Sequence, residues 1–428
     1  MQAKEDTDLA EIPEDIAAVG VPESGVAEPE PDGHPQWRVT LYCMWVAQGL
    51  AILGFSFVMP FIPFYIRELG VTDPRLLPIW AGLLVTGSGI TMSVASPVWG
   101  WVADHYGRKA MVQRAMFGGA VLLSLMGAVK NVRQLLFLRI LQGGVTGTAP
   151  ASVALISSVV PAAYLGSSLG LTQMAVFSGS SLGPYVGGVM AEHLGYRLPF
   201  YFTGGLLFLA GLLVLFGARE RFKRHVPADG SPPPRLREVL LFPGVLTLLA
   251  VFALLNFSGS FVGPIFPLFV ERVAGAPGRA AEQTGLILAI SGMTAALAAV
   301  MIGRVSDRLG YKPVLMVCTT LAGLLCFPQA AARSVGQLLV MRAVFGLAAG
   351  GMIPAMNALV ATAVPRHSLG RAYGLTTTAS ALGWASAPAI GGWMASVLGL
   401  RAPFVIMGGL YLALAVAEHW GVRSRAIR

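Results

Sequence analysis

The sequence GWVADHYGRK occupies residues 100–109, and a related sequence, GRVSDRLGYK, occupies residues 303–312. Both carry Gly, Asp, Gly and Lys at the same spacing, 203 residues apart. Further landmarks recur later in the sequence at an offset of 203 or 204: Arg139 and Arg342, Pro184 and Pro388, Pro199-Phe200 and Pro403-Phe404. A constant offset over separate landmarks predicts two homologous halves that share one orientation.

Most of the chain is too apolar for a soluble surface. Hydrophobic residues make up 55% of it, charged residues only 12%, and the mean hydropathy is +0.68, whereas a soluble domain carries about 25% charged residues. Twelve apolar runs approach the roughly 20 residues that a membrane-spanning helix needs. They are centred near residues 52, 90, 120, 146, 178, 208, 254, 293, 322, 349, 383 and 411. We therefore expect an all-α membrane protein with twelve transmembrane helices in two pseudo-symmetric six-helix bundles.

The charged residues divide the chain into four regions. Residues 1–36 form an acidic tail without aromatic residues, which we expect to be disordered. Residues 37–218 and 239–428 are the two six-helix halves, the second with a short basic tail, and residues 219–238 are a basic cytoplasmic linker. With the N-terminus inside, 19 Lys and Arg residues fall on the inner side and nine on the outer side, so we expect both termini to be cytoplasmic.

Composition and motifs also exclude several classes of protein. The net charge of +9 lies in short clusters between apolar runs, which is typical of membrane-surface loops and argues against a nucleic-acid partner. The three cysteines have no paired spacing, so neither a disulfide framework nor a metal site is expected. No phosphate-binding loop, HExxH sequence or nucleophile elbow is present, which argues against an enzyme, a cofactor or an ATP-driven pump. A non-transporting receptor remains a further alternative.

Over residues 37–421 the sequence resembles the major facilitator superfamily, and is most similar to its bacterial twelve-span drug:proton antiporters. GWVADHYGRK looks like the first signature of that superfamily, with Val102 and His105 as mild departures. The resemblance implies that the aspartate caps a neighbouring helix and pairs with basic residues, which closes the cytoplasmic side in the outward-facing state. The residues to which it gives a gating or proton-coupling role are Asp104, Arg108, Lys109, Asp307 and Arg308. The alternative is that these charges only set the topology.

Two arginines lie within apolar runs. Arg139, followed by Gln142, resembles the signature that the superfamily places near its proton-coupling site. A buried cation is costly in a membrane and should face a cavity or a partner. The alternative is an arginine that extends to the membrane surface. For Arg342, where Phe345 replaces the glutamine, both interpretations stay open.

The fifth apolar run resembles the signature that the superfamily associates with antiporters. Its residues are Gly179, Gly183, Pro184, Gly187 and Gly188. Small residues four apart let helix backbones approach closely, and the proline kinks the helix; generic helix packing is the alternative. We expect the equivalent pattern of the second half to be eroded, with Ala379 and Ala387 in place of glycines.

The resemblance implies a central cavity lined by spans 1, 4, 7 and 10 and flanked by spans 2, 5, 8 and 11. We expect substrate contacts from Arg139, Gln142, Gln173, Asn256, Phe261, Arg342, Asn357 and Trp384, and cavity-lining aromatic residues at Phe55, Phe61 and Phe177. Some of these residues would instead face lipid or neighbouring helices.

Acidic residues are missing from the middle of every predicted span. Glu68 falls at the outer end of span 1 and Glu418 near the inner end of span 12. The proton carrier could be Asp104, Glu68 or the pair Glu192–His193. Intramembrane arginines without intramembrane acids suit neutral, zwitterionic or anionic substrates.

Together these patterns predict a monomeric secondary transporter in the bacterial inner membrane, in contact with lipid, that exports drugs or small amphiphilic molecules by proton antiport with alternating access. The alternative is a proton-coupled or facilitative importer of a small nutrient or metabolite.

Overall fold

The computed structural model describes residues 35–220, 245–275, 277–363 and 369–421. The prediction of a disordered tail lies outside these residues, as does nearly all of the predicted linker. The side chains of Asp104 and Asp307 also lie outside the described part, so their predicted gating roles stay predictions.

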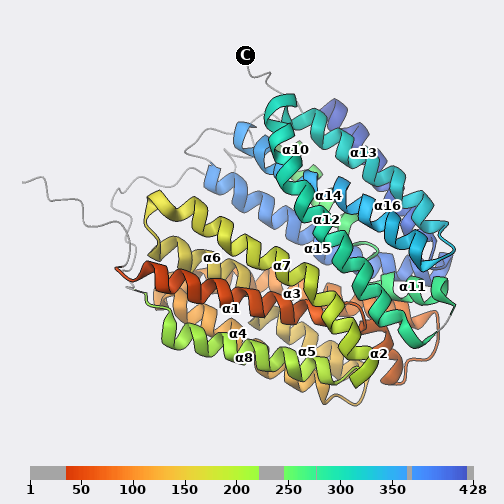
Figure 1. The fold of residues 1–428 in the computed structure, drawn as a ribbon, viewed down its shortest axis with the longest axis horizontal. Helices are drawn as coiled ribbons and strands as arrows, with labels where there is room; N and C mark the ends of the chain where they lie inside the picture. Colours follow the sequence, from red (N-terminus) through yellow and green to blue (C-terminus); the bar gives the residue numbers. More distant parts are fainter. Residues whose placement is uncertain (1–34, 221–244, 276, 364–368, 422–428) are drawn as a thin grey trace, which may run out of the picture.

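The described chain is helical throughout and contains no strand, which confirms the predicted fold class (Figure 1). The helices of the first half are α1 (Trp37–Phe57), α2 (Ile62–Glu68), α3 (Leu76–Tyr106), α4 (Arg108–Gly127), α5 (Val132–Val145), α6 (Thr148–Val159), α7 (Ala162–Leu194) and α8 (Leu198–Gly217). Those of the second half are α10 (Val245–Ser260), the 3-10 turn η2 (Gly263–Ile265), α11 (Phe266–Ala274), the 3-10 turn η3 (Pro277–Arg279), α12 (Ala280–Leu309), α13 (Tyr311–Ala330), α14 (Val335–Ala363), α15 (Leu369–Leu398) and α16 (Ala402–Gly421).

These helices correspond to the twelve predicted spans. Three spans are interrupted: α1 continues into α2, α5 into α6, and α10 through η2 into α11. Nine segments of the described chain are long and apolar enough to cross a membrane. The remaining three spans are the interrupted pair α5–α6 and the helices α7 and α15, which are rich in Gly, Ser and Thr.

Single glycines make the sharp turns between consecutive helices. Gly107 joins α3 to α4 with a φ of 96°, and Gly310 joins α12 to α13 with a φ of 91°. A positive φ is costly for residues that carry a Cβ atom. The second glycine of the repeated ten-residue sequence is therefore the residue that lets two long helices meet without a loop.

The two halves pack their helices in equivalent pairs. In the first half α3 packs on α5, α1 on α7 and α4 on α8, and in the second half α12 packs on α14, α10 on α15 and α13 on α16. Between the halves, α3 packs on α15 and α7 on α12, two contacts that the repeat also relates to each other. The described helices thus form two pseudo-symmetric bundles, which Figure 1 shows one above the other.

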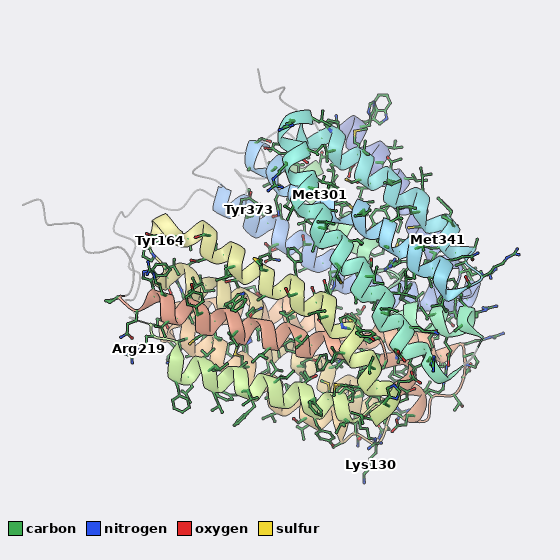
Figure 2. The ribbon with its side chains drawn as sticks, in the orientation of Figure 1. Lys130, Tyr164, Arg219, Met301, Met341 and Tyr373 are labelled. Carbon is green, nitrogen blue, oxygen red and sulfur yellow. The ribbon has the colours of Figure 1, made fainter. Side chains whose placement is uncertain are left out.

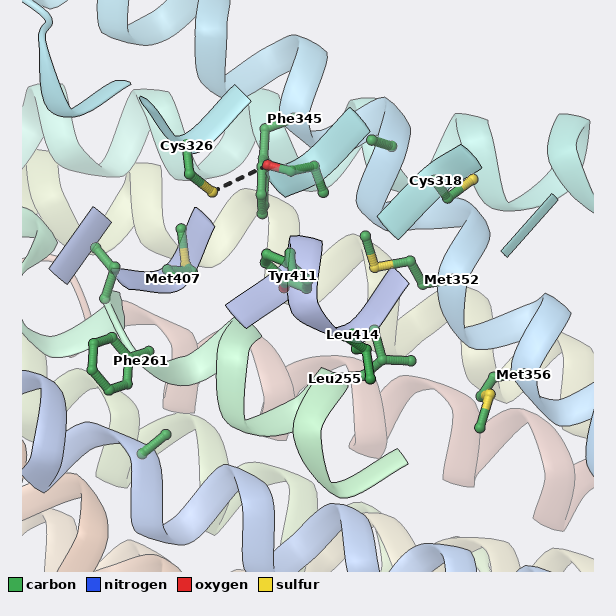
Figure 3. Packing of buried hydrophobic residues seen from close by; sticks show 14 of the residues in the cluster. Leu255, Phe261, Cys318, Cys326, Phe345, Met352, Met356, Met407, Tyr411 and Leu414 are labelled. Atoms are coloured by element: carbon green, nitrogen blue, oxygen red, sulfur yellow. Dashed lines mark hydrogen bonds between the residues drawn. The ribbon is translucent and has the colours of Figure 1, made fainter. Parts of the chain in front are cut away.

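Each bundle has its own apolar core. The core of the second half gathers side chains from α10, α13, α14 and α16, among them Phe345, Met352 and Tyr411 (Figure 3). One core cluster of the first half also includes Leu268 and Ala281 of the second half. The two bundles therefore share buried surface at the end of the molecule that contains α2 and α11. We call this end the closed end, and the opposite end, where α1 begins and α3 ends, the open end.

Candidate functional site

At the closed end, helix backbones of the two halves touch through glycines. The space that a Cβ atom of Gly82 on α3 would need is occupied by the carbonyl of Pro388 on α15, and that of Gly285 on α12 by the carbonyl of Pro184 on α7. The two contacts are equivalent under the repeat. Glycine is the only residue that fits either position without displacing a backbone.

These backbone contacts end part-way along the helices. Gly89 still packs on Ala385, and Gly292 on Ser181. Closer to the open end, four glycines of these helices have no atom within 4 Å of a built Cβ: Gly100 on α3, Gly170 on α7, Gly303 on α12 and Gly374 on α15. The halves therefore diverge towards the open end, as Figure 1 shows between α7 and α12.

Exposed side chains line the diverging part. Phe177 and Met174 lie on the same face of α7 as Ser181, about one and two turns further towards the open end, and Met174 is 61% exposed. Gln173 on α7 and Thr377 on α15 are also exposed. In Figure 2, Tyr164, Arg219 and Tyr373 lie at the open end, and Lys130 lies at the opposite end.

A bidentate ion pair joins the two halves at the closed end. Nη1 and Nη2 of Arg67 each donate a hydrogen bond of 2.8 Å to the carboxylate of Glu271. The two residues are 204 positions apart, so they occupy equivalent positions of the two halves and face each other across the pseudo-two-fold axis. Their side chains are 40% and 19% exposed.

Other polar groups add to this closure. Glu192 at the end of α7 accepts a hydrogen bond of 3.3 Å from the amide of Ala281 at the start of α12. Thr86 on α3 accepts one of 3.0 Å from the amide of Ala389 on α15. Glu68 instead pairs within the first half, accepting a bond of 3.0 Å from Nε of Arg197. This hydrogen bond raises the pKa of Arg197.

At the open end, the basic residues of the repeated sequence bind within their own halves. The amides of Arg108 and Lys109 donate to the carboxylate of Glu220, at 3.0 and 2.8 Å, so Glu220 caps α4. Nζ of Lys109 donates to the carbonyl of Leu215 at 2.8 Å. Arg308 is exposed. No local sequence pattern signals the cap, because Glu220 comes from the far end of α8.

The two intramembrane arginines have different surroundings. Arg139 is partly buried and donates a bond of 3.2 Å to Oε1 of Gln142, one turn further along α5. Arg342 is only 8% exposed, between the rings of Phe266 and Phe345, each 4.8 Å away. Arg342 lies in the core of the second half, so within the described part of the chain it has no open surface beside it that could hold a substrate.

The other predicted substrate contacts are dispersed. Phe261 is 1% exposed, inside the core of the second half, so a substrate cannot reach it in this conformation. Nδ2 of Asn256 donates to Ser380 at 3.2 Å and ties α10 to α15. Asn357 accepts a bond from Tyr373 through its carbonyl, and Trp384 packs on α3 at Gly89.

The three predicted aromatic lining residues are equally dispersed. Phe61 is fully buried at the closed end, and Phe55 is partly buried beside the same core. Of the three, Phe177 is the one on an exposed helix face. Gln173 and Phe177, both on α7, are thus the predicted contacts that lie in the diverging part.

The glycine-rich pattern of α7 holds that helix against α1 and α12. The packing partners are Leu53 for Gly179, Ser56 for Gly183, Phe57 for Gly187 and Ala281 for Gly188. In the second half, Gly383 packs on Ala253 as Gly179 packs on Leu53, and Gly391 packs on Phe261. The prediction that Ala379 replaces a glycine was therefore wrong, since Gly383 holds the equivalent position; Ala387 does replace one.

Two fully buried polar residues, Gln48 and Glu418, and one partly buried arginine, Arg114, were not among the predicted site residues. Gln48 on α1 is fully buried and accepts a bond of 2.8 Å from Ser152 on α6. Arg114 on α4 lies over the ring of Trp99 at 3.6 Å. Glu418 on α16 is fully buried. A single polar residue in an apolar run can be detected in the sequence, but the sequence does not show which neighbour it faces.

The sequence profile of the Major Facilitator Superfamily matches residues 44–281 and 276–426. The chain belongs to the major facilitator superfamily. Among its relatives are proteins named multidrug resistance protein MdtG from Salmonella paratyphi B and Salmonella typhimurium. Each is 33% identical over 395 residues, which cover 91% of this chain and 97% of the relative.

Solved structures share the fold at lower identity. A bacterial homologue of the human lysosomal transporter Spinster, in an inward-facing and occupied conformation, has a TM-score of 0.75 at 16% identity, covering 92% of this chain and 99% of its own. The nucleoside transporter NupG has a TM-score of 0.74 at 15% identity, covering 90% of this chain and 100% of its own.

Membership of the superfamily gives the two bundles their general role. Members of this superfamily move small molecules across membranes, so this chain is a multi-pass membrane transporter rather than an enzyme.

Proposed function

We propose that this transporter exports drugs or other small amphiphilic molecules from bacteria by proton antiport with alternating access, in the inner membrane. The observation that carries the proposal is the match, along nearly the whole chain, to relatives named for multidrug resistance. The full glycine and proline pattern of α7, typical of antiporters, supports the direction of transport.

The conformation supports alternating access. Symmetric glycine contacts and the Arg67–Glu271 pair seal one end, while the facing helices separate at the other. We propose that the open end faces the cytoplasm, since Arg108, Lys109 and Lys312 lie there and positive residues are retained inside. The structure then corresponds to the inward-facing state, in which an exporter takes up its substrate.

The surface of the diverging part supports a broad range of substrates. Met174 and Phe177 offer flexible and aromatic apolar area, and Gln173 and Thr377 offer uncharged hydrogen-bonding groups. The described part of this surface includes no carboxylate near these four residues on α7 and α15. Neutral, zwitterionic or anionic amphiphiles fit such a lining better than cations do.

Transport by purified protein in liposomes tests the function. A pH gradient would be imposed, and proton flux would be measured on addition of cationic, neutral and anionic drugs. Proton movement opposite to drug movement is the expected result. Drug movement without proton flux, or in the same direction as protons, would refute antiport and favour an importer or a uniporter.

A further inference from the structure

Glu418 is a buried acid without an ion-pair partner among the described residues. It lies on α16, about one turn before the helix ends at Gly421, and none of its surface is exposed. It contacts α13, which it meets at Thr319. It is thus an acidic residue enclosed between two helices, about one turn from the open end.

The hydrogen bonds around Glu418 are incomplete for a carboxylate. Oγ1 of Thr319 donates to the carbonyl of Leu315 at 2.8 Å and lies 3.2 Å from Oε1 of Glu418. A hydroxyl has one proton, which cannot serve both acceptors at full strength. Oε2 of Glu418 is buried and has no partner in the described chain. A protonated carboxyl group that donates through Oε1 to Oγ1 of Thr319 removes this competition and leaves Oε2 as an uncharged carbonyl oxygen.

The helices packed against α16 supply no counter-charge in the described part of the chain. On α13, Cys318 is uncharged as a thiol, and Nζ of Lys312 donates to the carbonyl of His419 at 2.9 Å. Helix α10 has no titratable residue, Tyr373 of α15 donates to Asn357, and the side chain of His419 is exposed. An unpaired buried carboxylate would be strongly disfavoured there.

The first half shows what the same packing looks like without the acid. The residues equivalent to Glu418 and Thr319 are Val214 on α8 and Met116 on α4, both fully buried. The neighbouring lysine contact is the same in both halves, since Lys109 donates to Leu215 as Lys312 donates to His419. Apolar side chains therefore suffice to pack these helices, and packing alone does not require a glutamate.

We propose that Glu418 is a proton-binding site of this transporter, positioned by Thr319, which holds a proton in the open conformation and releases it in the transport cycle. The carboxyl O–H bond breaks, the proton passes to water at the open end, and the negative charge stays on Glu418. This site lies between α13 and α16, away from the surface between the halves. Its role rests on the proposed antiport.

Infrared difference spectroscopy on the purified full chain in lipid tests the site directly. We expect a carbonyl band of a protonated carboxyl group that disappears on titration to high pH. It should be absent in Glu418→Gln, shifted in Thr319→Val, and retained in Asp73→Asn, which removes an exposed acid between α2 and α3. A band that persists in Glu418→Gln would overturn the proposal. Thr319→Val keeps the test informative if Glu418→Gln does not fold.

Transport distinguishes a proton carrier from a structural acid. In Glu418→Gln we expect uptake driven by a pH gradient to fall at least about tenfold, while exchange of labelled for unlabelled substrate without a gradient continues. Equal gradient-driven uptake in Glu418→Gln and wild type would overturn the proposal. If the wild type shows the Glu418 band but moves substrate without protons, the proposed antiport is refuted although the protonated site exists. If the wild type shows no such band, the proposed proton-binding site is refuted whatever the transport result.

Discussion

The ion pair between Arg67 and Glu271 should determine how firmly the closed end stays shut. Hydrogen bonds to charged groups contribute about 1.5–3 kcal/mol when buried, but Arg67 is 40% exposed, and exposed pairs contribute about 1 kcal/mol or less. The bidentate geometry favours the upper end of that exposed range. A loss of about 1 kcal/mol changes the ratio of conformations about fivefold. We therefore expect Arg67→Ala and Glu271→Ala each to increase the population that is open at this end.

The pseudo-symmetry provides a sharper variant. Because the two residues occupy equivalent positions, the double variant Arg67→Glu with Glu271→Arg rebuilds the same pair with its direction reversed. Arg67→Glu alone should open the closed end more than Arg67→Ala does, since two carboxylates then face each other. The double variant should restore the wild-type population.

Distances between spin labels would measure the effect. Lys130 and Arg333 are exposed, equivalent residues at the closed end of the two halves, and cysteines there could carry the labels once the partly buried Cys43 is replaced by serine. Cys318 and Cys326 are buried. Single variants should add a longer distance that the double variant removes. An unchanged distribution in the single variants, or no restoration in the double variant, would refute the role assigned to the pair.

Three further predictions concern packing, the two arginines and a helix cap. Gly285→Val should clash with the carbonyl of Pro184 and reduce transport in liposomes about tenfold or more, since overpacking costs about 1–3 kcal/mol. Gly205→Val is the control, because Gly205 has no neighbour within 4 Å of a built Cβ, and its transport should stay within about twofold of the wild type. Arg139→Met should reduce transport at least about tenfold. Arg342→Met should change transport by no more than about threefold, because an apolar side chain can replace a buried charge. A larger loss in Arg342→Met than in Arg139→Met would show that Arg342 is the functional residue. Glu220→Ala should lower the free energy of unfolding by about 1 kcal/mol through loss of the α4 cap, and an unchanged denaturation midpoint would contradict that assignment.

Periodic features of the fold could be predicted from the sequence, because a repeat and apolar length are properties of the chain itself. The offset between residues 100–109 and 303–312 predicted two equivalent bundles, and the structure pairs their helices accordingly. The interruptions were not predicted. Gly147, with a φ of 138°, separates α5 from α6 inside an apolar run that gave no other sign of a break. Hydropathy measures whether a segment can lie in lipid, not whether its helix is continuous.

The site was harder to predict because the direction of a side chain depends on its neighbours. Arg139 and Arg342 are equivalent in sequence, yet Arg139 donates to Gln142 on its own helix, whereas Arg342 lies between two aromatic rings and donates to Gln329 on α13. The residue three positions later did carry a usable signal, since phenylalanine cannot accept the hydrogen bond that glutamine accepts. The burial of Glu418 had no comparable signal, because its surroundings come from another helix.

Symmetric and asymmetric features of the two halves have different physical roles. Symmetry holds where backbones meet, as in the equivalent glycine contacts that join α3 to α15 and α7 to α12. Such contacts allow either end of the molecule to close in the same way, which is what alternating access requires. Asymmetry appears at particular charged positions. Arg67 faces its own counterpart, Glu271, because residues near a pseudo-two-fold axis face the equivalent residue of the other half. Opposite charges at such positions attract across the axis, whereas a strict repeat would place like charges together. Glu418 is a second asymmetric position, since its counterpart in the first half is Val214, but it lies within its own half rather than at the axis. A proton that binds to one half alone changes the energy of that half relative to the other, and a difference between the halves is what can bias their relative motion.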